Sequence, residues 1–124
     1  MIKKALLGLI TLTVALAIVA GGNAHPLKDS FALKGEVYPN FKIEMKNSSG
    51  HRLTRVAAGT YRIKIEDKSP IHNFHLTGPG VNKTTSVGGV SETTWTVTLK
   101  AGTYTYMCDP HAGQMRGTFR VVNT

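Results

Sequence analysis

The most informative segment of the sequence runs from residue 104 to residue 117 and reads Tyr104-Thr105-Tyr106-Met107-Cys108-Asp109-Pro110-His111-Ala112-Gly113-Gln114-Met115-Arg116-Gly117. It holds three soft or borderline metal donors, the thiol of Cys108, the imidazole of His111 and the thioether of Met115. Pro110 and Gly113 favour a tight turn, which would bring His111 and Met115 back beside the thiol. We therefore expect these side chains to meet at one site.

A second imidazole would have to come from upstream, where the sequence is Ser69-Pro70-Ile71-His72-Asn73-Phe74-His75-Leu76. If this segment is a strand, residues two apart share one face of the sheet. His72 then lies on the same face as Phe74 and Leu76, toward the apolar interior, whereas His75 faces solvent. We therefore expect His72 to complete the donor set.

The combination of donors matters more than any one of them. Taken alone, Cys108 would be a small buried hydrophobe and Met115 a core residue. Structural zinc sites use four strong donors and have no use for a thioether. Two imidazoles, a thiolate and a weakly held thioether form the donor set of an electron-transfer copper site. The sequence therefore predicts one copper ion held by His72, Cys108, His111 and Met115.

The pattern Cys-x-x-His-x-x-x-Met-Gly, with a Tyr-rich strand before it and His72-Asn73 upstream, resembles the blue copper (cupredoxin) family of amicyanins, plastocyanins and pseudoazurins. The resemblance covers essentially all of the chain after residue 24. It implies a type 1 copper ion with Met115 as the axial ligand. It also implies that Asn73 hydrogen-bonds the ligand loop near Asp109, and that the His111 ring edge reaches the surface in an apolar patch with such residues as Pro70, Ile71, Pro110 and Ala112.

The chain departs from its apparent relatives at three places. The His111 to Met115 spacing lies between those of amicyanin and plastocyanin. Met107 stands where plastocyanin has a tyrosine before the cysteine. Asp109 follows the cysteine where many relatives have Ser or Thr, and a carboxylate near the thiolate is expected to lower the reduction potential.

Short segments of alternating apolar and polar residues fill the rest of the chain, as in half-buried antiparallel strands. We expect strands at residues 33–37, 41–45, 52–56, 61–65, 72–76, 95–99, 104–108 and 117–122. Residues 47–50 should close a hairpin between the second and third of these, and residues 77–93 should form a long surface connection. The sequence thus predicts an all-β, cupredoxin-like Greek-key β-sandwich of about seven or eight strands.

The first residues have the features of a secretory signal peptide. Lys3 and Lys4 precede an apolar run from Ala5 to Ala20, and Gly22-Asn23-Ala24 offers a cleavage site. The run is at the short end for a membrane span, which needs about 20 apolar residues. We expect residues 1–24 to be removed and residues 25–124 to form one exported domain, periplasmic or extracellular, without stable membrane insertion.

Charge and cysteine content limit the function further. One cysteine cannot form an internal disulfide. Without Lys3 and Lys4, 13 of the 15 basic residues remain against 7 acidic ones, a net charge of +6. This charge favours acidic partners, although a solubilising excess of charge is the alternative, because the Lys and Arg residues are not clustered. The sequence has no basic run with interleaved aromatic residues, so it does not indicate nucleic-acid binding.

These features predict a monomeric carrier that shuttles single electrons between redox protein partners, not an enzyme, because no nucleophile–base set or second metal cluster is evident. The alternative is an envelope protein that binds or delivers copper without shuttling electrons. A β-sandwich interaction module without metal is a further alternative. The visible spectrum of the copper-loaded protein would distinguish them.

Overall fold

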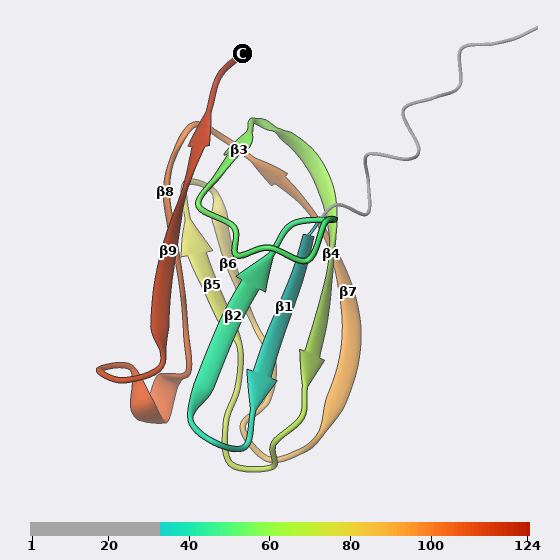
Figure 1. The fold of residues 1–124 in the computed structure, drawn as a ribbon, viewed down its shortest axis with the longest axis vertical. Helices are drawn as coiled ribbons and strands as arrows, with labels where there is room; N and C mark the ends of the chain where they lie inside the picture. Colours follow the sequence, from blue (N-terminus) through green and yellow to red (C-terminus); the bar gives the residue numbers. More distant parts are fainter. Residues whose placement is uncertain (1–32) are drawn as a thin grey trace, which may run out of the picture.

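The computed structural model describes residues 33–124, which form a sandwich of two β-sheets (Figure 1). The first sheet has the order β2-β1-β4-β7, with β1 (Leu33–Tyr38), β2 (Lys42–Lys46), β4 (Gly59–Asp67) and β7 (Ser91–Leu99). The second has the order β3-β9-β8-β5-β6, with β3 (Arg55–Ala57), β5 (His75–Gly78), β6 (Val81–Thr84), β8 (Gly102–Met107) and β9 (Arg116–Val122). The expected all-β sandwich is confirmed.

One short 3₁₀ helix, η3 (Asp109–His111), follows β8 and lies at the lower left of Figure 1. The described residues hold no helix that is long and apolar enough to cross a membrane. The expected signal peptide, residues 1–24, lies outside the described part of the chain.

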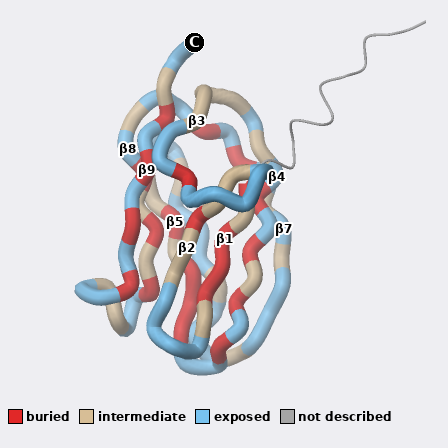
Figure 2. The backbone as a smooth tube through the Cα atoms, in the orientation of Figure 1, coloured by how far each residue is buried: buried red, intermediate tan, exposed pale blue. Residues whose placement is uncertain are grey.

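The alternating sequences form strands because each sheet buries one face. The longest pairing joins β4 to β7 in antiparallel register, from Gly59 opposite Leu99 to Asp67 opposite Ser91. In the second half of β4, Ile63 and Ile65 are fully buried, whereas Arg62 and Lys64 are exposed. Figure 2 shows the same alternation of buried and exposed positions along several strands. Side chains two apart therefore fill the space between the sheets.

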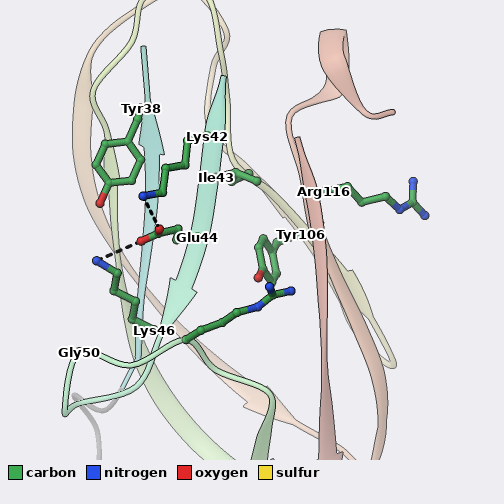
Figure 3. Close-up of a pocket in the computed structure, with 9 residues that line it drawn as sticks. Tyr38, Lys42, Ile43, Glu44, Lys46, Gly50, Tyr106 and Arg116 are labelled. Carbon is green, nitrogen blue, oxygen red and sulfur yellow. Dashed lines mark ion pairs between the residues drawn. The ribbon is translucent and has the colours of Figure 1, made fainter. Parts of the chain in front are cut away.

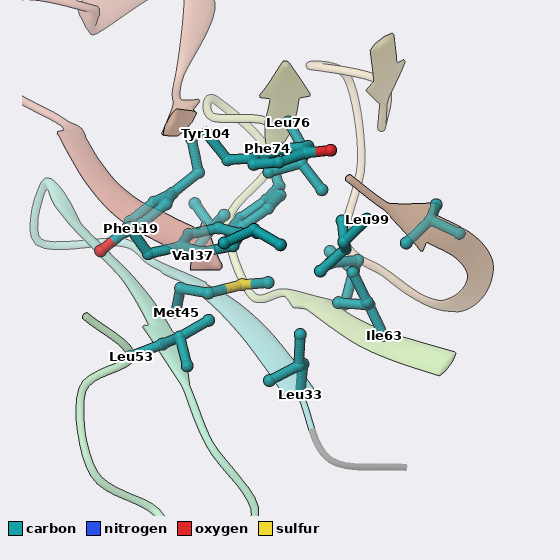
Figure 4. Close-up of a cluster of buried hydrophobic side chains, with 14 of the residues drawn as sticks. Leu33, Val37, Met45, Leu53, Ile63, Phe74, Leu76, Leu99, Tyr104 and Phe119 are labelled. Atoms are coloured by element: carbon teal, nitrogen blue, oxygen red, sulfur yellow. The ribbon is translucent and has the colours of Figure 1, made fainter. Parts of the chain in front are cut away.

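Aromatic pairs form much of the core (Figure 4). The rings of Phe74 and Tyr106 stack with centroids 5.8 Å apart, and those of Tyr104 and Phe119 stack at 5.4 Å. The Tyr104 hydroxyl donates to the carbonyl of Pro79 at 2.8 Å, so burying this phenol leaves no unpaired donor. Aliphatic side chains from both sheets and from the segment before β3 surround the rings, including Leu33, Val37, Leu53, Ile63, Leu76 and Leu99.

Residues 52–56 do not form the second arm of a hairpin with β2, so this prediction is wrong. The turn at residues 47–50 leads only to an isolated bridge between Lys46 and Arg52. Buried Leu53 still donates its amide to the carbonyl of Met45, at 2.7 Å, but the chain then crosses to the second sheet. There β3 pairs in parallel with β9. Local alternation identifies a strand but cannot tell which edge it will join.

The predicted long connection over residues 77–93 is also wrong. β5 continues to Gly78, turns through Pro79 and Gly80, and pairs with β6 in an antiparallel hairpin. β7 then begins at Ser91. This hairpin accounts for a ninth strand in the described residues. Its outward side chains are polar because one face of an antiparallel sheet meets water, so its sequence is similar to that of a loop.

Candidate metal centre

Cys108 directly follows β8, and the loop after it is held tightly by backbone hydrogen bonds. The amide of Cys108 donates to the carbonyl of Met115 at 3.0 Å, and the amide of Met115 donates to the carbonyl of His111 at 2.8 Å. Pro110 occupies the start of η3, where its missing amide hydrogen costs nothing. As the sequence predicts, the turn returns His111 and Met115 to the neighbourhood of the cysteine.

His72 comes from a loop and not from a strand, because β5 begins only at His75. His72, Asn73 and Phe74 are all buried, so alternation cannot be the reason for the inward position of His72. A turn at the end of β4 directs this loop instead, since the Ser69 amide donates to the buried Asp67 carboxylate at 3.1 Å. Burial raises the pKa of Asp67. An Asp-x-Ser sequence is typical of such a turn, so residues 67–69 could have predicted it.

Three of the four predicted donors converge. The Nδ1 atoms of His72 and His111 lie 3.1 Å apart, and the Cys108 Sγ lies 3.6 Å from the first and 3.5 Å from the second. A point equidistant from the corners of a triangle with these sides lies about 2.0 Å from each of them, close to the bond lengths of metals to nitrogen and sulfur. The triangle therefore fits a single ion.

The surroundings of the triangle also suit a metal. His72 and Cys108 are fully buried, and His72 Nε2 has no hydrogen-bond partner among the described residues. His111 is half-buried and so connects the site to the surface. Met115 is 1% exposed, and its residue is hydrogen-bonded through the backbone to Cys108. An apolar enclosure with one more accessible imidazole excludes water from the donors while leaving one route to them.

A side-chain bridge ties the two ligand-bearing loops together. Asn73 Oδ1 accepts a hydrogen bond from the Asp109 amide at 2.8 Å, and Asn73 Nδ2 donates to the Asp109 carboxylate at 2.9 Å. The link that the family resemblance implied is thereby confirmed. It holds His72 and Cys108 at a fixed separation, because each is adjacent in sequence to one end of the bridge.

His75 lies on the outer face and extends this bridge. Its Nδ1 is 2.8 Å from the Asp109 carboxylate, and its Nε2 is 2.6 Å from Asn82 Oδ1. The hydrogen bond with Asp109 raises the pKa of His75. Partial burial raises the pKa of Asp109, but the hydrogen bonds from His75 and Asn73 outweigh it and lower that pKa. His75 thus supports the ligand loop from outside.

Phe41 is a site residue that the sequence did not reveal. Its ring lies edge-on to both imidazoles, with centroids 4.8 Å from His72 and 4.9 Å from His111. It is 41% exposed and has a φ of 62°, the left-handed region that a bulky residue rarely adopts. Alternation with Ile43 and Met45 placed it in a strand, but β2 begins one residue later. Strain of this kind is typical of functional sites.

A groove between β2 and β9 lies apart from the donors (Figure 3). Tyr38, Lys42, Glu44, Lys46 and Tyr106 are among its lining residues. Glu44 pairs with Lys42 at 2.8 Å and with Lys46 at 3.1 Å, so these charges are already compensated. None of the three converging donors lines the groove, and we assign it no role in metal binding.

A two-sheet sandwich that gathers two imidazoles and one thiol at one end defines a mononuclear copper protein of the cupredoxin class. The model of the copper-binding proteins of the plastocyanin/azurin family matches residues 35–122. The chain belongs to this family, and His72, Cys108 and His111 form a site typical of a type 1 copper centre. No curated protein sequence is significantly similar to the chain.

Solved structures show the same fold. Reduced rusticyanin is 23% identical, with 72% of this chain and 77% of that chain covered and a TM-score of 0.53. Rusticyanin from Thiobacillus ferrooxidans is 22% identical, with 72% and 75% covered and a TM-score of 0.52. An oxidized amicyanin mutant gives a weaker likeness, with 19% identity, 73% and 81% covered and a TM-score of 0.48.

Proposed function

We propose that the chain is an exported carrier of single electrons, with one type 1 copper ion bound by His72, Cys108 and His111 and axially by Met115. The observation that carries the proposal is the triangle of Nδ1, Nδ1 and Sγ atoms with sides of 3.1–3.6 Å. Copper held there would supply a one-electron couple, because imidazole suits the cupric ion and sulfur the cuprous ion.

The protein's part in this function is to keep the donors in place. Two sheets, the Asn73–Asp109 bridge and the hydrogen bonds that close the Cys108–Met115 loop all restrain ligand movement. Donors that move little between two oxidation states need little reorganisation, which makes electron exchange fast. We propose electron transfer, and not substrate turnover, as the function of this site.

Electron entry would occur at His111. His111 is half-buried and precedes Ala112 in the chain; of the exposed apolar side chains, Phe41 contacts its ring and Ile71 precedes His72. We propose that redox protein partners, including acidic ones, contact this patch and that the chain acts as a monomer. The apolar segment before residue 24 supports export to the periplasm or the extracellular space.

The visible spectrum of the copper-loaded protein tests the proposal. We expect an intense thiolate-to-copper charge-transfer band in red light, and we expect Cys108→Ser to abolish it. His72→Ala should also remove the band, whereas His75→Ala, which removes no donor but only the outer support of the loop, should keep it. Stoichiometric copper binding by a colourless wild-type protein would refute electron transfer and favour a copper-holding or copper-delivery role.

A further inference from the structure

The two outer faces of the sandwich carry their charges in different ways. The lysine–glutamate ion pairs of residues 33–124 belong to the first sheet and to Lys68 just beyond β4. Glu36, for example, is nearly buried and lies within 3.4 Å of the amines of Lys34, Lys46 and Lys68. On this face opposite charges compensate each other within the molecule.

The outer face of the second sheet carries arginines without such compensation. Arg116 and Arg120 are exposed positions of β9, with buried Gly117 and Phe119 on the opposite face. Arg55 of β3 lies directly opposite Arg120. The described part of the chain gives none of these three guanidinium groups an ion-pair partner. We call Arg55, Arg116 and Arg120 the arginine row.

This arrangement is unfavourable for the isolated molecule. Like charges directly opposite each other on neighbouring strands destabilise a sheet. The residues beside the row are uncharged, since Arg120 pairs with Thr103 and the next outward position of β9, Thr118, pairs with Thr105. Arg116 is also one of the residues that line the groove of Figure 3. None of the direct neighbours of the row carries a negative charge that would offset the repulsion, so a ligand from outside has to be considered.

The arginine row is long and extends to the end of the sandwich that holds Cys108. Arg116 directly follows Met115 and pairs with Met107, which directly precedes Cys108. Arg120 lies four residues further along β9, about 13 Å away at the rise of a strand. In Figure 1, β3 lies beside the upper end of β9, so Arg55 extends the row at the end opposite to η3. Its length suits a surface with several acidic groups better than a single small anion.

From these observations we propose that the arginine row is a docking surface for a carboxylate-rich protein partner. A planar guanidinium can donate hydrogen bonds to both oxygens of a carboxylate at once, and arginine is enriched at protein interfaces. The proposal goes beyond electron transfer, because these arginines hold no metal and their binding is measurable whatever the redox role of the chain.

An anionic membrane is a poorer occupant for this face. Proteins that lie on membranes combine basic residues with large apolar side chains that enter the lipid. The exposed large hydrophobic residues of the described chain are Phe41, Ile71, Val87 and Val90, and none belongs to a strand of the second sheet. Most of the face consists of threonines, arginines and other polar side chains such as His75 and Asn82, which favours a wet, polar protein interface.

The test measures binding of fluorescent poly-L-glutamate to the copper-loaded protein at low salt by anisotropy. The variant Arg55→Gln/Arg116→Gln/Arg120→Gln removes three positive charges from the row. The matched control, Lys34→Gln/Lys42→Gln/Lys64→Gln, removes three from the first sheet. We expect roughly a tenfold weaker Kd for the arginine variant and less than about a twofold change for the control. Both should keep the wild-type visible spectrum.

Two results would overturn the proposal. If both variants weaken binding equally, overall charge attracts the polyanion and the row has no special role. The second result would come from measuring binding to vesicles of phosphatidylglycerol and phosphatidylcholine. Arginine-dependent binding to these vesicles, without binding to poly-L-glutamate, would identify lipid as the ligand instead of an acidic protein.

Discussion

At the scale of single residues, Met115 combines complete burial with a fixed backbone. Because its amide and carbonyl are both hydrogen-bonded within the loop, substitution of its side chain should leave the loop folded. A thioether favours the cuprous ion over a harder amide oxygen. We expect Met115→Gln to lower the reduction potential and Met115→Leu to raise it, each by about 59 mV if the relative affinity for the two oxidation states changes tenfold. Voltammetry of the copper-loaded variants measures both shifts, and potentials that move in the same direction would show that Met115 is not an axial donor.

Phe41 combines a strained backbone with a side chain that covers the metal site. Its left-handed backbone conformation costs on the order of 1–3 kcal/mol. Its ring lies against the imidazole of His72 and helps to shield this buried side chain from solvent. In Phe41→Gly, relief of the strain should offset the lost ring contacts, so we expect the free energy of unfolding to change by less than about 1 kcal/mol. Loss of the cover should speed copper removal by a chelator about tenfold.

Phe41→Leu is the matched variant, because it keeps an apolar cover on the same backbone. We expect its copper release to stay close to wild type. Equal release from the glycine variant and the wild type, measured by loss of the visible band in excess chelator, would show that the ring does not protect the site.

At the scale of elements, the first sheet depends on Glu36 as the centre of its ion pairs. Burial would raise the pKa of Glu36, but hydrogen bonds from Lys46, Tyr38 and Lys68 outweigh it and lower that pKa from 4.5 to about 2. A carboxyl group whose pKa is lowered by folding stabilises the protein above its unfolded pKa, and this contribution is lost as the pH falls from about 4.5 to about 2.

We therefore expect Glu36→Gln to cost about 1–3 kcal/mol of unfolding free energy at neutral pH, a range that allows for the solvent exposure of the lysines. The difference from wild type should shrink toward pH 2, as measured by denaturant unfolding at several pH values. Glu92→Gln is the control, since Glu92 is well exposed and pairs with Lys64 at the sheet surface. A Glu36 effect that is independent of pH would mean that packing, not charge, is lost.

At the scale of the whole molecule, the metal end and the opposite end should differ in their effect on electron exchange. Ala112 follows His111, whereas Ser48 lies in the turn after β2, away from η3 in Figure 1. Self-exchange brings the metal ends of two molecules together, so Ala112→Asp places like charges in contact. We expect it to slow self-exchange roughly tenfold or more, with little change in the spectrum, and Ser48→Asp to do much less. Line broadening in mixtures of reduced and oxidized protein measures the rate, and equal slowing by both variants would rule out His111 as the point of electron entry.

The fold class and the residues to consider at the site could be predicted from the sequence alone. Cys108, His111 and Met115 lie within one short turn, so Pro110 and the backbone hydrogen bonds of that turn suffice to bring them back together. The strands were also predictable where one face is buried, as in β4 and β7, because burial imposes a period of two on the sequence. These features depend on neighbours in the chain.

Which distant segments meet could not be predicted from the sequence, because it depends on tertiary packing. His72 points inward because Asp67 and Ser69 turn its loop and Asn73 ties that loop to Asp109, not because of strand alternation. Phe41 reaches the imidazoles, and β3 leaves β2 to pair with β9, through contacts between residues far apart in sequence. The arginine row likewise exists only because that pairing sets Arg55 beside Arg120. Local periodicity fixes which face a side chain takes, but the free energy that selects a partner segment comes from packing the whole core.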